Sequence, residues 1–119
     1  SIVVPQNGKF VLIDFWASWC GQCLAAFPKL EAIGKAYQDN FTIIDLSIDV
    51  KEEAWRKAMA KHPQIWQQYR TTNQGYKDLF TKYQIGNGVP YFVLIAPNGK
   101  VMKSPQSVEE ITEILKQHL

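Results

Sequence analysis

Cysteine occurs at two positions in this chain, within the stretch Trp19-Cys20-Gly21-Gln22-Cys23. The pair stands where an apolar, strand-like run ends and a helix-like run begins. A thiol at the start of a helix is close to the positive end of the helix dipole and to unpaired backbone N–H groups, which favour the thiolate. A second thiol one turn further along can attack a mixed disulfide formed by the first and release the product. The spacing therefore predicts a two-electron thiol-disulfide switch.

Two other uses of such a pair are open at this point. Zinc commonly takes four ligands, and besides the cysteines the chain offers only His62 and His118, neither at the spacing of a zinc finger. A purely structural disulfide between such close neighbours closes a loop of only a few residues, where the entropic stabilisation is smallest. Both uses fit the spacing less well than redox chemistry does.

Length and charge narrow the class of protein. A chain of 119 residues fits one domain, 1–119, and is long enough to build a core without further staples. Its 13 basic and 11 acidic residues are scattered without a basic run, so neither nucleic acid nor an anionic membrane surface is indicated as a partner. The longest apolar stretch, Phe10 to Cys20, is too short to span a bilayer. The chain begins without an initiator methionine or a leader pattern, which we interpret as a mature or excised piece of a longer protein.

The order of elements is predicted from hydrophobic periodicity and from turn residues. The first strand is apolar on both faces, as in the centre of a sheet. Pro28 lies inside the first helix and should kink it. Ser107 and Glu110 form a capping box that opens the last helix. The expected elements are strand 9–16, helix 20–37, strand 41–49, helix 51–61, an undecided strand or loop at 64–69, a loop at 71–75, helix 76–83, strand 91–96, strand 101–103 and a helix from 107.

This alternation of strands and helices, closed by a hairpin, indicates an α/β fold with a mixed central sheet covered by helices on both faces. Reactive groups in such sheets gather beyond the carboxyl ends of the strands, and Cys20 follows such an end.

Asp14 and Pro90 are unusual residues for their places in strands. Asp14 interrupts an apolar strand, and burial there raises the pKa of a carboxyl group, so that it could exchange protons with the cysteines. The alternative is that Asp14 lies on a hydrated face or caps a loop. Pro90 opens a later strand, where it is either an ordinary strand-initiating residue or part of a cis peptide bond.

The aromatic and histidine residues divide by position. Trp16 and Trp55 are expected to pack in the core. Trp19 stands beside the first cysteine at an exposed strand end, where it is expected to contact a substrate. His62 is expected at the surface and His118 in solvent.

The run from Phe10 to Cys23, together with Pro28, Val89-Pro90 and Pro97-Asn98-Gly99, resembles the thioredoxin superfamily over most of the chain. The long segment Lys51 to Ile85 resembles the TlpA-like thiol-disulfide oxidoreductases, which overlap in sequence with the peroxiredoxin-related group. The resemblance implies a thioredoxin-like three-layer αβα sandwich. It also implies an extracytoplasmic or periplasmic cell-envelope setting, whereas ordinary thioredoxins are cytoplasmic.

The resemblance also implies roles for individual residues. By it, Cys20 attacks the substrate disulfide, Cys23 resolves the mixed disulfide, and Asp14 assists proton transfer. It further implies a cis Val89-Pro90 bond bordering a substrate groove, with the Val89 backbone bonded to an extended substrate segment. Trp19, Gly21 and Gln22 complete the expected substrate-binding set.

Two positions depart from the thioredoxin pattern. Gln22 stands where thioredoxins commonly have proline; it restores a backbone N–H near Cys20 and adds an amide donor, so Gln22→Pro is expected to lower the reduction potential. Asp45 stands where thioredoxins often have a lysine near the buried acid, so proton handling is expected to differ.

The leading hypothesis is a monomeric protein thiol-disulfide oxidoreductase, a reductase by analogy. It exchanges electrons with cysteines of substrate proteins and of an unknown redox partner protein, and it needs no cofactor besides the Cys20–Cys23 couple. A copper-delivery domain that uses both thiolates, and a peroxidase, are the alternatives.

Overall fold

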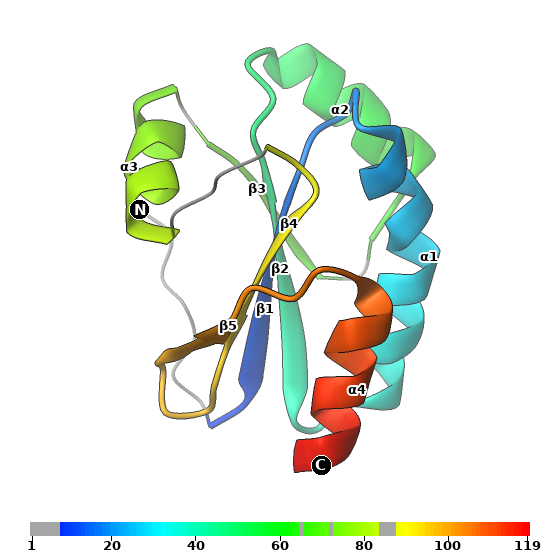
Figure 1. Cartoon of the computed structure of the whole chain (residues 1–119). Helices are drawn as coiled ribbons and strands as arrows, with labels where there is room; N and C mark the ends of the chain where they lie inside the picture. Colours follow the sequence, from blue (N-terminus) through cyan, green and yellow to red (C-terminus); the bar gives the residue numbers. More distant parts are fainter. Residues whose placement is uncertain (1–7, 65, 72, 84–87) are drawn as a thin grey trace.

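The computed structural model describes residues 8–64, 66–71, 73–83 and 88–119. Its strands form one mixed sheet in the order β3-β2-β1-β4-β5 (Figure 1). Strands β1, β2 and β3 run parallel, and β4 is antiparallel to both β1 and β5. The strands are β1 (Phe10–Trp16), β2 (Phe41–Ser47), β3 (Gln67–Arg70), β4 (Tyr91–Ile95) and β5 (Val101–Lys103).

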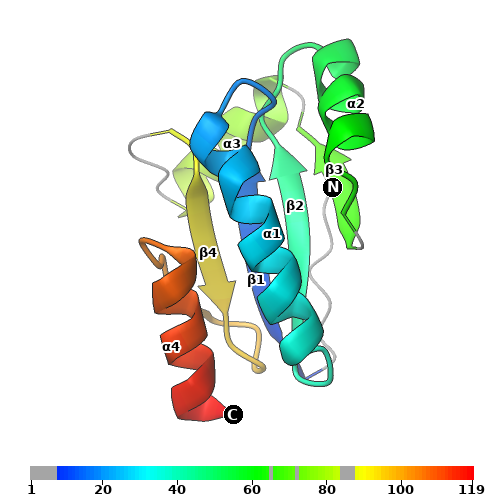
Figure 2. The ribbon, with the colours of Figure 1, turned by 90° about the vertical axis from the view of Figure 1, so that its right-hand side faces the viewer.

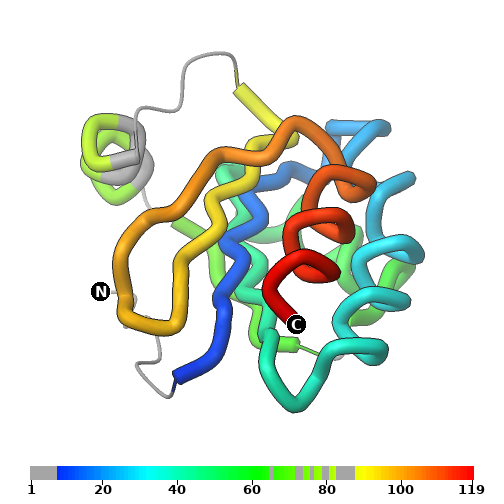
Figure 3. The backbone as a smooth tube through the Cα atoms, turned by 60° about the horizontal axis from the view of Figure 1, so that its bottom comes forward, coloured from blue at the N-terminus to red at the C-terminus, as the bar shows by residue number. Residues whose placement is uncertain are grey.

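Helices cover both faces of this sheet. Figure 2 shows α1, α2 and α4 in front of the sheet and α3 behind it, and Figure 3 shows α4 lying beside α1. The predicted αβα sandwich with a mixed sheet is therefore confirmed. The helices are α1 (Gly21–Ala36), α2 (Glu52–Lys61), α3 (Asn73–Tyr83) and α4 (Val108–His118).

The central strand β1 is buried along its whole length, which explains its lack of polar alternation. Side chains of successive strand residues point to opposite faces, and each face of β1 belongs to a different apolar cluster. Leu12 and Trp16 lie in the cluster under α1, together with Phe27 and Leu30 of that helix. The opposite face contributes Val11, Ile13 and Phe15 to the second cluster.

The ends of the predicted elements differ most from the structure where polar side chains form hydrogen bonds with each other. Strand β2 ends at Ser47 rather than at Asp49, because Asp49 turns back to accept a hydrogen bond from the Ser47 hydroxyl. Helix α3 begins at Asn73, within the segment expected to be a loop, and its first turn is bridged by Gln74 Nε2 donating to Asp78 Oδ1 at 3.1 Å.

Two sequence interpretations are refined by the structure. The undecided segment contains β3, an edge strand that pairs with β2. At the start of α4, Ser107 Oγ accepts from the backbone of Glu110 at 3.1 Å, as a capping box requires. Glu110 Oε1, however, accepts from the backbone of Gln106 at 2.9 Å, one residue earlier than the usual partner.

Among the described residues, no helix has both the length and the apolar composition needed to cross a membrane.

Candidate active site

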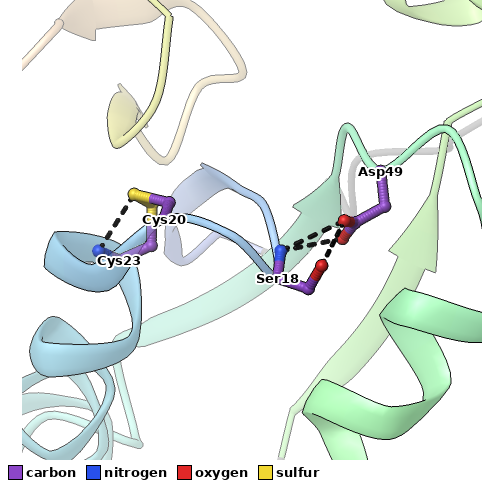
Figure 4. The surroundings of a disulfide bond; sticks show 4 residues. All are labelled: Ser18, Cys20, Cys23 and Asp49. Carbon is purple, nitrogen blue, oxygen red and sulfur yellow. Dashed lines mark hydrogen bonds between the residues drawn. A yellow bond between two sulfur atoms is a disulfide. The ribbon is translucent and has the colours of Figure 1, made fainter.

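Cys20 and Cys23 form a disulfide at the amino end of α1 (Figure 4). Cys20 is the N-cap residue of this helix, in extended conformation, and its Sγ accepts a hydrogen bond from the backbone of Cys23 at 3.1 Å. Its position is fixed by a short turn, in which Cys20 N donates to Ala17 O at 3.0 Å. The first turn of α1 therefore directs a backbone N–H at the Cys20 sulfur, which favours negative charge there once the disulfide opens.

The two cysteines differ in their access to solvent. Cys20 is 7% exposed and Cys23 is 1% exposed. Gly21 and Gln22 are exposed, and Trp19 is 69% exposed. Cys20 is therefore the more accessible cysteine, while Cys23 faces the core.

The loop before Cys20 is held by Asp49, a residue that the sequence analysis did not single out. Ser18 N donates to both carboxylate oxygens of Asp49, at 3.2 and 3.0 Å, and Ser18 Oγ donates to Oδ1 at 2.6 Å (Figure 4). Asp49 is buried, and its Oδ2 also accepts from Ser47. The signal in the sequence was an acidic residue just beyond β2, since β1 and β2 are parallel and their carboxyl ends meet at the same edge.

Asp14 is 1% exposed, so the alternative of a hydrated face is wrong. It lies on β1 between Leu12 and Trp16, which belong to the cluster that also contains Cys23. Burial raises the pKa of the Asp14 carboxyl well above its ordinary value, and the negative charge of Asp45 raises it further.

Asp45 is the register partner of Asp14 on β2 and is fully buried. Its Oδ2 accepts a hydrogen bond from Gln68 Nε2 of β3 at 2.6 Å. Burial raises the pKa of Asp45, while the neighbouring polar side chains of Asp14, Gln68 and Trp66 act in the opposite direction. The sequence predicted a change in proton handling at this position, but not that the two carboxyl groups pair.

The segment before β4 lies at the same end of the sheet as the disulfide. Tyr91 is the register partner of Phe15, so Pro90 lies beside the carboxyl end of β1. The Val89-Pro90 peptide bond is cis, and the Val89 side chain packs against the cluster that contains Cys20 and Cys23.

The other tryptophan and histidine residues named in the sequence analysis differ in how deeply they are buried. Trp16 is fully buried and meets Phe27 edge-on, with ring centroids 5.0 Å apart. Trp55 is half-buried against the same cluster. The expectation of a surface position for His62 is only partly right, because its ring is half-buried, 6.4 Å from that of Phe27. His118 is exposed, with its ring 5.8 Å from that of Phe10. In the described part of the chain, no three His, Cys, Asp or Glu side chains gather into a group able to hold a metal ion.

Known proteins are similar to this chain in sequence and in fold. A thioredoxin-like family model matches residues 7–101. Thioredoxin of Alicyclobacillus acidocaldarius subsp. acidocaldarius is 44% identical over 48 residues, which cover 40% of this chain and 46% of that protein. The match thus spans less than half the length of that thioredoxin.

Solved structures match over almost the whole chain. The thioredoxin domain of a thiol-disulfide oxidoreductase from Bacteroides vulgatus is 31% identical with a TM-score of 0.85, over 95% of this chain and 81% of that one. A thiol-disulfide oxidoreductase from Bacteroides fragilis NCTC 9343 is 30% identical with a TM-score of 0.82, over 95% and 83%.

The sheet, the disulfide at the start of α1 and these similarities define a thioredoxin-like thiol-disulfide oxidoreductase. The chain belongs to the thioredoxin-like family whose model covers residues 7–101.

Proposed function

We propose that this chain is a single domain that reduces disulfide bonds in substrate proteins by thiol-disulfide exchange. In its reduced form, the Cys20 thiolate attacks one sulfur of the substrate disulfide. The substrate S–S bond breaks, a Cys20–substrate mixed disulfide forms, and the other substrate sulfur leaves as a thiolate that takes a proton from solvent. The observation that carries this proposal is the Cys23 N–H directed at the Cys20 sulfur at a helix start, with Cys20 the more exposed cysteine.

Cys23 completes the cycle. It loses its proton to the buried acid Asp14 and attacks the Cys20 sulfur of the mixed disulfide. The Cys20–Cys23 bond forms, and the reduced substrate leaves. A dithiol partner protein then reduces the domain, and two electrons pass from that partner to the substrate in each cycle.

The substrate is proposed to bind across Trp19, Gly21, Gln22, Val89 and Pro90. The exposed Trp19 side chain offers an aromatic surface beside Cys20. The backbone of Val89 pairs with an extended segment of the substrate, as in strand addition. Trp19→Ala should weaken the reduction of a protein substrate and leave that of a small disulfide unchanged. Tyr69→Ala on β3, also an exposed aromatic residue, is the matched control.

We further propose that the domain is TlpA-like and acts in the cell envelope, and, as a separate proposal, that it is a monomer. The support for the TlpA-like assignment is the resemblance of the segment between β2 and β4. Fractionation of cells that express the full-length protein tests the compartment, and light scattering tests the oligomeric state.

The test of the exchange mechanism uses single cysteine variants and a protein disulfide substrate. Cys23→Ser should trap a covalent complex through Cys20 that is released by a reductant, while Cys20→Ser should form no such complex. Substrate reduction should be lost in both variants. A Cys20→Ser variant that still reduces the substrate would overturn the assignment of the nucleophile.

Gln22 offers a test of how the first turn of α1 affects the reduction potential of the Cys20–Cys23 disulfide. Gln22 is the second residue of α1, and proline there removes one backbone N–H from the neighbourhood of Cys20. We expect Gln22→Pro to lower the reduction potential in a glutathione equilibrium titration, because the Cys20 thiolate loses a donor. Gln22→Ala is the control, since it removes the side-chain amide and keeps the N–H. An unchanged or higher potential in Gln22→Pro contradicts this expectation.

A further inference from the structure

A row of polar side chains crosses three neighbouring strands beneath α1. Asp14 of β1 is in register with Asp45 of β2, and Asp45 is in register with Gln68 of β3. The two acids are 1% and 0% exposed. On the other side of Asp14, the register partner in β4 is the apolar Phe92. The row of polar side chains therefore continues from Asp14 toward β3 and ends at Asp14 on the β4 side. It contains no lysine or arginine.

The two acids of this row can form a hydrogen bond with each other only when they share a proton. Asp14 Oδ2 and Asp45 Oδ1 are buried and lack a donor as long as both groups are carboxylates. A proton on either group lets it donate to the other, and the two residues are register partners on neighbouring strands, so their side chains lie on the same face of the sheet. Two adjacent carboxylates without a counter-ion are strongly unfavourable in a buried site, so the pair holds at least one proton.

The position of the proton within the pair follows from Gln68. Its amide donates to Asp45 Oδ2 at 2.6 Å, and such a donor favours the charged form of the acceptor. Asp14 has no comparable donor among the described residues. The proton therefore resides on Asp14, and the charge resides on Asp45.

This distribution poses a problem for Asp14 as the base of the second exchange step, because an acid that already holds its proton cannot accept another at the same oxygen. A carboxyl group can, however, accept a proton at one oxygen and release a proton from the other. Such a relay requires a neighbouring carboxylate that receives the released proton, and Asp45 is placed to do so.

We propose that Asp45 is a positioning residue of this active site, which forms with Asp14 one unit that stores the proton of Cys23, while Gln68 holds Asp45 in its charged form. This inference rests on the exchange mechanism proposed above and deepens it. During resolution, the Cys23 S–H proton passes to Asp14 and the proton of Asp14 passes to Asp45. The Cys23 thiolate then forms the bond to Cys20, and the substrate thiolate leaves with the electron pair of the broken bond. The stored proton returns to Cys23 when the partner dithiol reduces the domain.

The surroundings of the pair add few other titratable groups among the described residues. Cys23 of α1 lies in the same cluster as the residues that flank Asp14. His62, at the end of α2, packs against Phe27, and Asp49 is engaged by Ser18 and Ser47 beyond the end of β2. The other side chains that the helices contribute to this cluster are apolar: Leu24, Ala26, Phe27, Leu30 and Ile33 of α1, Trp55, Ala58 and Met59 of α2, and Val108, Ile111, Ile114 and Leu115 of α4.

The first test follows the carboxyl groups directly by NMR in the oxidised protein. In Asp45→Asn the negative charge beside Asp14 is removed while shape is kept, so the titration midpoint of Asp14 should fall. It should stay above the value of an exposed aspartate, because burial remains. Asp39→Asn, an exposed acid after α1, is the matched control and should leave Asp14 unchanged. An unchanged midpoint in Asp45→Asn overturns the paired unit.

The second test measures the resolving step. A preformed mixed disulfide between Cys20 and a small thiol is allowed to resolve over a range of pH in a single turnover. With Asp45→Asn, we expect resolution near neutral pH to slow by at least about tenfold, as for loss of an acid-base group, and the inflection of the pH profile to disappear. Asp45→Glu should restore part of the rate. A wild-type rate and pH profile in Asp45→Asn overturns the proposal.

Gln68→Ala provides an independent variant should Asp45→Asn fail to fold. Loss of the amide donor should raise the proton affinity of Asp45 and move the inflection of the pH profile upward, whereas a merely structural Gln68 would leave the inflection in place. Failure of the exchange mechanism is recognised separately, because it would prevent formation of the mixed disulfide through Cys20. Normal formation of that complex with unaltered resolution in both variants would refute only the role of Asp45.

Discussion

The Asp14 carboxyl group makes the stability of the protein depend on pH. In an unfolded chain the pKa of an aspartate is about 3.9. In the folded state, burial and the charge of Asp45 raise the pKa of Asp14 above this value. Between these two pKa values the folded protein holds a proton that the unfolded chain has lost. The free energy of unfolding contributed by Asp14 is therefore greatest below the unfolded pKa, and it decreases as pH rises toward the folded pKa.

Asparagine cannot ionise, so Asp14→Asn should remove the part of the decrease in unfolding free energy with rising pH that is due to Asp14. We expect the variant to gain stability over wild type as pH rises from acid to neutral, by roughly 1.4 kcal/mol for each unit of raised pKa within that window. Urea unfolding at several pH values measures the difference in unfolding free energy between Asp14→Asn and wild type, with Asp39→Asn as the control. A difference between variant and wild type that is the same at all pH values would contradict the expected linkage. The same substitution should slow resolution by Cys23, so stability and function oppose each other at this residue.

Asp49 stabilises the turn that delivers Cys20, although no sequence motif identifies it. Its carboxylate accepts from the backbone and hydroxyl of Ser18 and from the Ser47 hydroxyl. Because the substitution removes the acceptor of several hydrogen bonds to a charged group, each worth about 1.5–3 kcal/mol, Asp49→Ala should destabilise the fold by at least about 3 kcal/mol. It should also change the alkylation rate of reduced Cys20. Ser18→Ala, which keeps the backbone N–H bond, should cost less. Equal unfolding free energies for the two variants would show that Asp49 does not hold this turn.

At the scale of the elements, the sequence was most informative where a single physical cause dominates. The largely apolar run of β1 and the helical spacing of Phe27, Leu30 and Ile33 in α1 predicted elements that the structure reproduces within one residue. The sequence does not decide between a strand and a loop at 64–69, because β3 is a short edge strand. Its half-buried residues, Gln68 and Arg70, are polar and alternate with exposed residues, so neither face shows an apolar pattern. Its effect on the site depends on register with β2, and register is a property of the assembled sheet.

The packing of α1 on the sheet suggests a stabilising substitution at Gly34. A Cβ atom at this position would lie 3.4 Å from both Ile43 Cδ1 and a ring carbon of Trp66, at the near limit of ordinary contact. Alanine is the better helix former, so Gly34→Ala should raise the free energy of unfolding by about 0.5–1 kcal/mol. The larger, β-branched side chain in Gly34→Val should overpack this contact and lower it. Thermal and urea unfolding measure both variants, and destabilisation by alanine would show that the contact has no room for a methyl group.

At the scale of the whole molecule, the candidate site was predicted in part. Cys20, Cys23 and Asp14 follow from residue type and local spacing, since the helix start and the buried strand are local features. The clamp by Asp49 and the pairing of Asp14 with Asp45 arise only when parallel strands bring together residues about 30 positions apart, and composition or periodicity does not contain that information. The core consists of two apolar layers on opposite faces of β1, and the two cysteines belong to only one of them.

Because most of both layers is made of aliphatic and aromatic side chains, we expect the fold to survive the loss of both sulfurs. A disulfide between residues three positions apart closes a very short loop, for which chain-entropy arguments give only about 2 kcal/mol. A domain of this size commonly has roughly 5–15 kcal/mol of stability, so the double variant Cys20→Ser, Cys23→Ser should remain folded. We expect near-native circular dichroism and a cooperative urea transition, with a free energy of unfolding lower than that of the oxidised protein by no more than about 2 kcal/mol. An unfolded or molten double variant would mean that the disulfide organises the core, and the pair would then be structural as well as redox-active.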